Sequence, residues 1–293
     1  MPTRLVCVAI VLYWLYAVVG LVTRDLIPEL SVGTPPDLRT IAAAGEDAGP
    51  ARWIIQVVDH PNEVDGRRSV GQAVTESKRE SNGEVVMTSK VVFDSARLLG
   101  GMVRGGRPVS SPIDEQLTFD STYHVDPSGN LKSFHAEVRA GGQSADLWKI
   151  DGVLKNHAIE VVSRGPLPLF NRTYSFEYQP REVVQSQFGP LDRLPGLQVG
   201  QRWDERVANP FTSQVDTVRA TVERKVSIFW NDSTVETLEV VHRSKAVSAR
   251  TWVRRDGLVL RQEVALPLLR LVLERLPQVT SKSLLTPSEG NGR

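Results

Sequence analysis

The side chains that most often carry acid–base or metal chemistry are scattered along this sequence of 293 residues. Histidine comes first, because its charge changes near neutral pH and its ring nitrogens bind metals. His135 lies two residues before Glu137, which places both on one face of a strand. His124 and Asp126 form a second such pair. Pairs of this kind are common on polar strand faces, so we predict no metal site. No His-x-His or His-Glu-x-x-His cluster occurs among the histidines, which are His60, His124, His135, His157 and His242.

No motif marks a nucleophile or a phosphate-binding loop. Gly-x-Ser-x-Gly and Ser-x-x-Lys are absent, and the glycine-rich stretch at 98–108 lacks both Gly-Lys-Ser/Thr and Gly-x-Gly-x-x-Gly. The one cysteine, Cys7, lies in an apolar N-terminal run, which leaves the rest of the chain without a thiol nucleophile or an intrachain disulfide. Glu76, Glu80 and Glu84 indicate a solvated strand face rather than paired catalytic carboxylates. We therefore predict a protein that is not an enzyme and uses no cofactor. A hydrolase whose serine, histidine and carboxylate meet only in the folded chain stays open.

The charge of the chain is balanced and evenly spread. Its 35 basic and 34 acidic residues give a net charge of +1. A nucleic-acid binder carries a concentrated basic surface, so we predict no nucleic-acid partner.

The N-terminus predicts a membrane anchor. Residues 5–22, LVCVAIVLYWLYAVVGLV, are 18 residues without a charge. As a helix they would span about 27 Å, close to the hydrocarbon thickness of a bilayer. The run is longer than the apolar part of a cleaved signal and lacks a good small-x-small site after it, so we favour a signal-anchor over residues 5–24, behind a tip at 1–4. A cleaved signal is the alternative. Short N-termini usually stay inside, which predicts a single-pass protein of the inner or cytoplasmic membrane with a periplasmic or extracytoplasmic body.

The remainder of the chain predicts one β domain. Residues 25–51 are rich in Ala, Gly and Pro and predict a flexible linker, and residues 280–293 predict a disordered tail. Residues 52–279 predict an antiparallel β domain, because strand-like segments alternate with turn residues. The expected turn centres are Asn82-Gly83, Pro127-Ser128-Gly129, Asp151-Gly152, Asn231-Asp232-Ser233 and Asp256-Gly257.

Apolar alternation predicts that the sheet has one buried and one wet face. In the segment around 218–223, Val218, Ala220 and Val222 point one way and the polar residues between them the other. Helix is expected only over 110–117, and residues 266–277 fit either a helix or, as we favour, a final strand. The proline-rich region 166–211 is expected to connect two halves of the sheet. We predict a mainly β fold, one large curved antiparallel sheet or half-open barrel built from hairpins, with an N-terminal transmembrane helix and little other helix.

Five tryptophans are the candidate binding residues of this sheet. Large rings contribute much of a core, and a curved sheet lined with them is also suited to an apolar ligand. The candidate cavity or core aromatics are Trp53, Trp148, Trp203, Trp230 and Trp252.

Two groups of motifs in the chain resemble a known family. Toward the C-terminus, GLQVGQRW (196–203), Asn209-Pro210 and TWVRRDGLVLR (251–261) follow one another, and YHVDPSGNLKSFHAEV (123–138) and LWKIDGVLKNHAIEVV (147–162) precede them. Their order over residues 53–277 resembles an exported bacterial domain of uncharacterised function, which is also found ahead of transglutaminase-like modules. That domain is similar to the periplasmic lipoprotein-carrier (LolA/LolB-like) fold, an open barrel around a hydrophobic cavity. The resemblance implies binding of a ligand or lipid, and the transglutaminase cysteine is absent.

The leading hypothesis is therefore a membrane-anchored, extracytoplasmic β domain that binds an apolar ligand or a lipid-like envelope component without catalysis. The first alternative is a structural or accessory module that docks a partner envelope protein through a sheet edge or the 166–211 connection. The second alternative is the hydrolase with dispersed catalytic residues.

Overall fold

The computed structural model describes residues 13–14, 36–45, 49–58, 66–95, 116–141, 146–166, 168, 171–180, 184–185, 189–209, 214–244, 248–265 and 269–278. In these ranges no helix has both the length and the apolar character needed to cross a bilayer. Apart from Tyr13 and Trp14, the predicted anchor at 5–24 lies outside the described residues. So do the predicted tail at 280–293 and most of the helix expected over 110–117, of which only Gln116 and Leu117 are described. Those two residues begin a strand.

In the described part of the chain, fifteen strands form a single sheet, which confirms the prediction of a mainly β fold with one large sheet and little helix. The strands are β1 (Ala51–Val58), β2 (Arg67–Arg79), β3 (Val85–Asp94), β4 (Gln116–Val125), β5 (Leu131–Ala140), β6 (Asp146–Lys155), β7 (Ala158–Arg164), β8 (Arg172–Glu177), β9 (Val184–Gln185), β10 (Arg202–Asn209), β11 (Gln214–Trp230), β12 (Ser233–Arg243), β13 (Ser248–Arg254), β14 (Val259–Ala265) and β15 (Arg270–Arg275).

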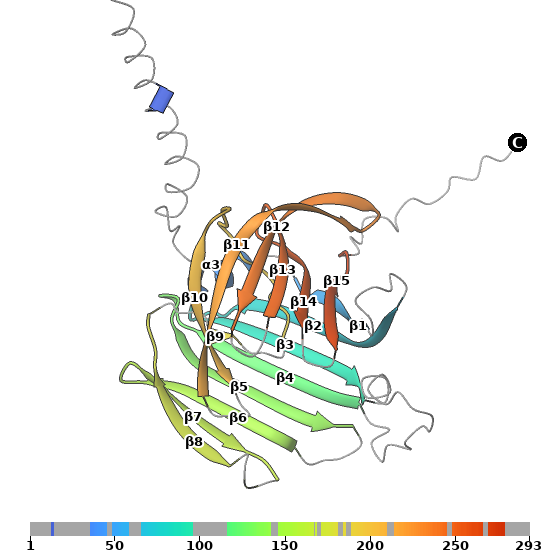
Figure 1. Ribbon diagram of the computed structural model, residues 1–293. Helices are drawn as coiled ribbons and strands as arrows, with labels where there is room; N and C mark the ends of the chain where they lie inside the picture. The colour runs from blue at the N-terminus through green and yellow to red at the C-terminus, as the bar shows by residue number, and fades with distance from the viewer. Residues whose placement is uncertain are drawn as a thin grey trace, which may run out of the picture.

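The sheet consists of two meanders that meet in its middle. Its order is β8-β7-β6-β5-β4-β3-β2-β1-β15-β14-β13-β12-β11-β10-β9, so the first half, β1–β8, joins the second half, β9–β15, through the β1–β15 pair. All neighbours are antiparallel except β9 and β10. Among the described residues the sheet is not closed, because β8 and β9 stand at its two ends. Figure 1 shows how strongly it bends, with β10–β14 of the second half lying above β3–β6 of the first.

The bend encloses two main apolar clusters. One joins β1–β3 to β10–β14 around Trp53, Ile55 and Val222, all at most 1% exposed. The other lies under β3–β7, around Leu131, Ile159 and Val161. Residues 189–201, which we call the crossover segment, enter the first cluster through Leu194, which is 1% exposed. The predicted alternation around 218–223 is confirmed, since Ala220 and Val222 are fully buried while Arg219 is exposed.

Four of the five predicted turn centres are confirmed, and the fifth is wrong. Asp151-Gly152 lies inside β6, and the chain turns instead at Asn156-His157, where φ is 48° and 65°. Gly152 pairs with Phe134 of β5, and a Cβ on Gly152 would come within 2.1 Å of that ring. The glycine therefore provides space for an aromatic ring on the neighbouring strand, a tertiary role that local turn chemistry does not reveal.

The expected linker at 25–51 contains helix α3 (Leu38–Gly45). Asp37 caps it by accepting a hydrogen bond from the Thr40 amide at 2.7 Å. Leu38, Ile41 and Ala42 are each at most 5% exposed, so this helix is part of the core and the structure differs here from a flexible tether. By contrast, the strand favoured for residues 266–277 is confirmed as β15.

The Asp256-Gly257 turn joins β13 to β14 and supports the crossover segment. Gly257 has φ +85°, and a Cβ there would lie 2.7 Å from the Pro195 backbone, so both its conformation and its contact favour glycine. The Leu194 amide donates to the Gly257 carbonyl at 2.8 Å. The Asp256-Gly257 turn, which the sequence predicts as a hairpin, therefore also holds the crossover segment in place.

The same turn gives a pH-dependent prediction. Arg254 donates to both carboxylate oxygens of Asp256, at 2.9 and 2.6 Å, and this pairing lowers the pKa of Asp256 against the opposing effect of burial. Because the pKa of Asp256 is lower in the folded than in the unfolded state, the pair stabilises the protein at pH values above the ordinary aspartate pKa. This stabilisation is lost as the pH falls through the pKa of the folded state. Because the side chain is about half exposed, we expect an effect below about 1 kcal/mol.

Urea unfolding at about pH 6 and about pH 3 measures this effect. We expect the unfolding free energy to fall less between these pH values for Asp256→Asn, which preserves the Asn-Gly turn chemistry, than for the unchanged protein. Equal falls for the two proteins would show that the Arg254–Asp256 pair does not contribute.

Candidate functional site

The structure does not gather the five candidate tryptophans around one cavity. Trp53 lies in the core between the halves, and its Nε1 donates to Thr75 Oγ1 at 3.2 Å. Trp203 belongs to the same core cluster. Trp230 and Trp252 belong to a separate cluster with Ile228, Leu258 and Leu260. Only Trp148 faces the apolar trough described below, and its Nε1 donates to Ser163 Oγ at 2.7 Å.

The candidate site is a cavity of about 90 Å³ where the two halves meet, which we call the seam cavity. It lies between helix α3, strands β2–β4 and the start of the crossover segment, and most of its exposed surface is apolar. Its largely apolar lining is Leu38, Ile41, Met87, Tyr123, Pro190 and Leu191, and the acidic residues Glu76 and Asp192 line it as well. Its hydroxyl-bearing lining is Thr75, Ser77, Thr88, Ser89 and Ser121.

A trough on strands β3–β6 continues the seam cavity, because Ser89 and Ser121 line both. Strand register explains its shape. Register partners across β2–β5 form a row of small side chains, Thr75, Ser89, Ser121 and Ala136. The row beside it toward one end of the strands is larger: Met87, Tyr123 and Phe134. The row on the other side is also larger: Val91, Phe119, Val138 and Trp148.

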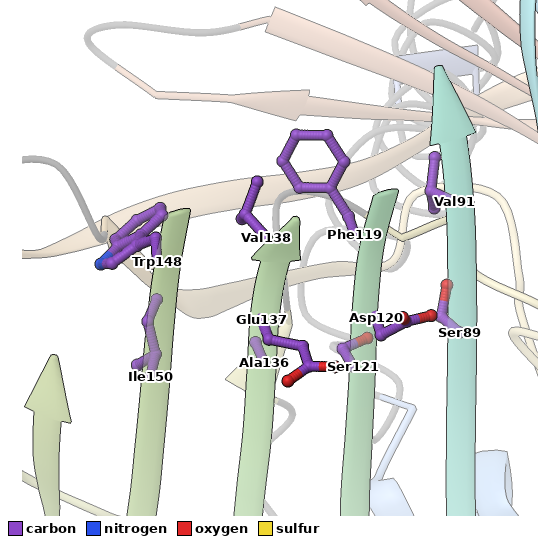
Figure 2. Close-up of a pocket in the computed structure, with 10 residues that line it drawn as sticks. All are labelled: Ser89, Val91, Phe119, Asp120, Ser121, Ala136, Glu137, Val138, Trp148 and Ile150. Carbon is purple, nitrogen blue, oxygen red and sulfur yellow. The ribbon is translucent and has the colours of Figure 1, made fainter. Parts of the chain in front are cut away.

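Figure 2 shows this arrangement, with Val91, Phe119, Val138 and Trp148 lying above Ser89, Ser121, Ala136 and Ile150 on four neighbouring strands. The small row crosses four strands, so it runs about 14 Å at the usual spacing of strands. Tyr123 and Phe134 stack on one flank at 6.0 Å, and Phe93 packs edge-on against Phe119 at 5.6 Å on the other. Larger side chains flank the small residues on both sides, and the space between them is narrow, with a volume of about 20 Å³ in the trough. We call the trough and the seam cavity together the channel.

Ser89 has an unusual position in this channel. Its Oγ is buried, and among the described residues it has no hydrogen-bond partner. The crossover segment passes directly over it, since a Cβ on Gly189 would lie 2.8 Å from Ser89 Oγ. Burying a hydroxyl without a partner is unfavourable, so this group needs an explanation.

The wall formed by the crossover segment is held by a buried arginine. Arg275 of β15, whose side chain is 2% exposed, forms an ion pair with Asp192 and donates to the Asp192 carbonyl at 3.3 Å. Its guanidinium also lies 5.5 Å from the centre of the Trp53 ring. The Arg275 carbonyl accepts a hydrogen bond from Trp230 Nε1 at 2.7 Å. Arg275 thus connects the cavity wall to β1 through Trp53 and to the β11–β12 hairpin through Trp230.

A buried carboxylate, histidine and threonine lie together in the second half. Glu205 Oε2 is 3.4 Å from His242 Nδ1, and His242 Nε2 is 3.3 Å from Thr251 Oγ1. The order resembles that of a carboxylate–histidine–hydroxyl catalytic triad. Thr251 is 1% exposed, however, and none of the described cavities is lined by it. In the part of the chain that the structure describes, this hydroxyl is therefore covered.

The hydrogen bonds around this group show a structural use. Gln262 Nε2 donates to Thr251 Oγ1 at 3.4 Å, and Gln262 Oε1 accepts from the Leu191 amide at 2.8 Å. At the other end, Trp203 Nε1 donates to Glu205 at 2.6 Å. This series of contacts links Leu191 of the cavity wall to β10 through side chains that each have a partner.

Of the two histidine pairs singled out by the sequence, His135 and Glu137 form an ordinary surface contact. His135 approaches Glu137 at 3.6 Å as expected for strand neighbours, and it also contacts Asp151 of β6 at 2.7 Å. Arg139 and Lys149 pair with Glu137 as well, which makes a mixed ladder of charges. Within the part of the chain that the structure describes, no group of three or more His, Cys, Asp or Glu residues is placed to hold a metal ion.

Sequence reasoning missed the residues that line the seam cavity. Ser89 and Ser121 are single serines in alternating strands, and their neighbourhood depends on the pairing of three strands. Leu191 and Pro190 lie in an irregular segment whose position depends on Arg275 and Gln262, more than 70 residues away. The sequence offered one indication of this lining, because Met87 and Tyr123 fall on the same face of their strands as these serines.

Comparisons with known proteins add little beyond this geometry. No family model matches the sequence, and no curated protein matches it. One similar solved structure is a beta-barrel-like protein of the domain of unknown function DUF1849 from Brucella abortus, with a TM-score of 0.46, 9% identity, and coverage of 78% of this chain and 98% of that one. Another is a DUF1089 family protein from Pseudomonas aeruginosa, with a TM-score of 0.35, 13% identity, and coverage of 64% and 87%. These two structures are thus described as members of families of unknown function.

Proposed function

We propose that this protein is a non-catalytic binding protein that holds a chain-like apolar ligand in the seam cavity and its trough. The observation that carries the proposal is the continuous apolar channel between two aromatic flanks, entered from the seam between the halves. Apolar cavities in proteins hold little or no ordered water, so an apolar molecule that enters gains contacts with the lining at little cost. A lipid-like component of the cell envelope is the ligand class that this channel suits.

The size and shape of the channel favour a chain over a compact ligand. The enclosed cavity, at about 90 Å³, is too small for a whole lipid, but the small-residue row extends it across four strands. A hydrocarbon chain laid along that row would contact Met87 and Tyr123 on one side and Phe119 on the other. We also propose that residues 5–24 anchor the protein in a membrane and that the β domain is extracytoplasmic. Its fold is, in this proposal, distantly related to that of the lipoprotein carriers.

Native mass spectrometry of the full-length chain, released from detergent micelles, tests the proposal with lauryl alcohol as the probe. We expect saturable retention of one alcohol molecule per chain, because the seam cavity and the trough share Ser89 and Ser121 and so form one site. Retention that rises without saturation, or no retention, would contradict the proposal.

A second candidate function rests on the edge of the sheet. Strand β8 pairs with β7 on one side, and among the described residues no strand lies on its other side. Edge strands offer backbone groups to an incoming strand, which is how many domains bind extended peptides. Crosslinking in membranes from a cysteine placed at Thr173 of β8 tests this docking, and failure to recover a reproducible partner would count against it.

A further inference from the structure

We infer that the ligand of the seam cavity carries a hydroxyl or carbonyl oxygen on its apolar chain, and that Ser89 Oγ binds this oxygen. The inference rests on the proposed function and narrows the class of ligand. It starts from Ser89 Oγ, which is buried and has no hydrogen-bond partner among the described residues.

The packing around Ser89 does not explain why this residue is a serine. The residue lies where the cavity and the trough join, in the middle of the channel. Its register partners Thr75 and Ser121 flank it on β2 and β4. Thr75 Oγ1 already accepts from Trp53 Nε1 at 3.2 Å. An alanine at position 89 would fill the same volume without a buried hydroxyl, so the apolar packing does not require serine.

The chemistry of the hydroxyl defines what it binds. A serine Oγ donates one hydrogen bond and accepts others, so it pairs with an alcohol or with the carbonyl of an ester. Met87, Tyr123 and Phe119 line the walls on either side of Ser89. A bare hydrocarbon in the same channel would leave the Ser89 hydroxyl unsatisfied. A fatty alcohol or an acyl ester is therefore favoured over an alkane of equal length.

Two probes and one substitution test the inference with the full-length chain. Lauryl alcohol and dodecane have chains of the same length and differ by one hydroxyl. We expect Ser89→Ala to weaken the binding of lauryl alcohol about fivefold, as one hydrogen bond between neutral groups would. We expect the same substitution to leave dodecane binding unchanged or slightly tighter, because it removes an unsatisfied group. Affinities are measured by titration in native mass spectrometry.

Thr122→Ala is the matched control, since it also removes one hydroxyl but lies on the face of β4 opposite Ser121 and lines neither the cavity nor the trough. We expect it to change neither affinity. Equal effects of Ser89→Ala on the two probes, or no effect on either, would overturn the inference while leaving the cavity as a binding site. Failure of both probes to bind the unchanged protein would overturn the proposed function and this inference with it.

Discussion

Replacing Arg275 by methionine is expected to lower the free energy of unfolding by about 3 kcal/mol or more, the loss typical of breaking one side of a buried ion pair. The guanidinium is almost fully buried, and it contacts Asp192 and the Trp53 ring. Its removal leaves the Asp192 carboxylate, with 17% of its side chain exposed, beside Arg193 at 3.8 Å as its remaining cationic neighbour. Urea denaturation of the two proteins at neutral pH measures the difference.

Arg270→Met is the control on the same strand. Arg270 is 44% exposed and lies 4.0 Å from Glu263, so we expect its replacement to cost less than about 0.5 kcal/mol. The double variant with Asp192→Leu should recover much of the loss, because it removes the unpaired carboxylate as well. A cost for Arg275→Met as small as that of the control would mean that the crossover segment is held by other contacts.

Replacing Ser121 by phenylalanine is expected to weaken lauryl alcohol binding more than tenfold. Ser121 is 8% exposed and lines both the cavity and the trough, so an added ring lies across the path of the ligand. Phenylalanine is well suited to a strand, and the cavity offers space, so we expect a stability cost within the range of about 1–3 kcal/mol for overpacking. Titration by native mass spectrometry measures the affinity, and thermal unfolding shows that the variant folds.

Thr122→Phe provides the comparison, since it introduces the same ring one residue later on the opposite face of β4. Its binding of lauryl alcohol should equal that of the unchanged protein. If Ser121→Phe folds and still binds like the control, the ligand does not occupy the channel between Phe119 and Tyr123.

The sheet and its turns were accessible from sequence because they depend on local patterns. Alternation around Ala220 and Val222 and positive-φ turns such as Asn231-Asp232 need no knowledge of distant residues. Gly152 was misread because Asp-Gly normally marks a turn, whereas its role here is to admit the Phe134 ring from the next strand. Helix α3 was missed because eight residues in an Ala- and Gly-rich segment carry too little periodicity to show a buried face.

The candidate site was less accessible for a related reason. Tryptophans are conspicuous in a sequence, but four of the five line neither the trough nor the seam cavity. The seam cavity arises where β2–β4 meet the crossover segment, and that meeting depends on Arg275 and Gln262 from the far end of the chain. Contacts between residues so far apart in the sequence cannot be recognised from the local pattern of any single strand.

The central claim, that the seam cavity holds an apolar chain, is tested most directly by locating a photoreactive ligand on the protein. The full-length chain in membranes is labelled with a lauryl alcohol that carries a diazirine in its chain, and the modified peptides are identified by mass spectrometry. The account predicts labelling of peptides that contain Met87, Tyr123 or Leu191, suppressed by an excess of unlabelled lauryl alcohol. Labelling that spares these peptides, or that the excess alcohol does not reduce, would contradict it.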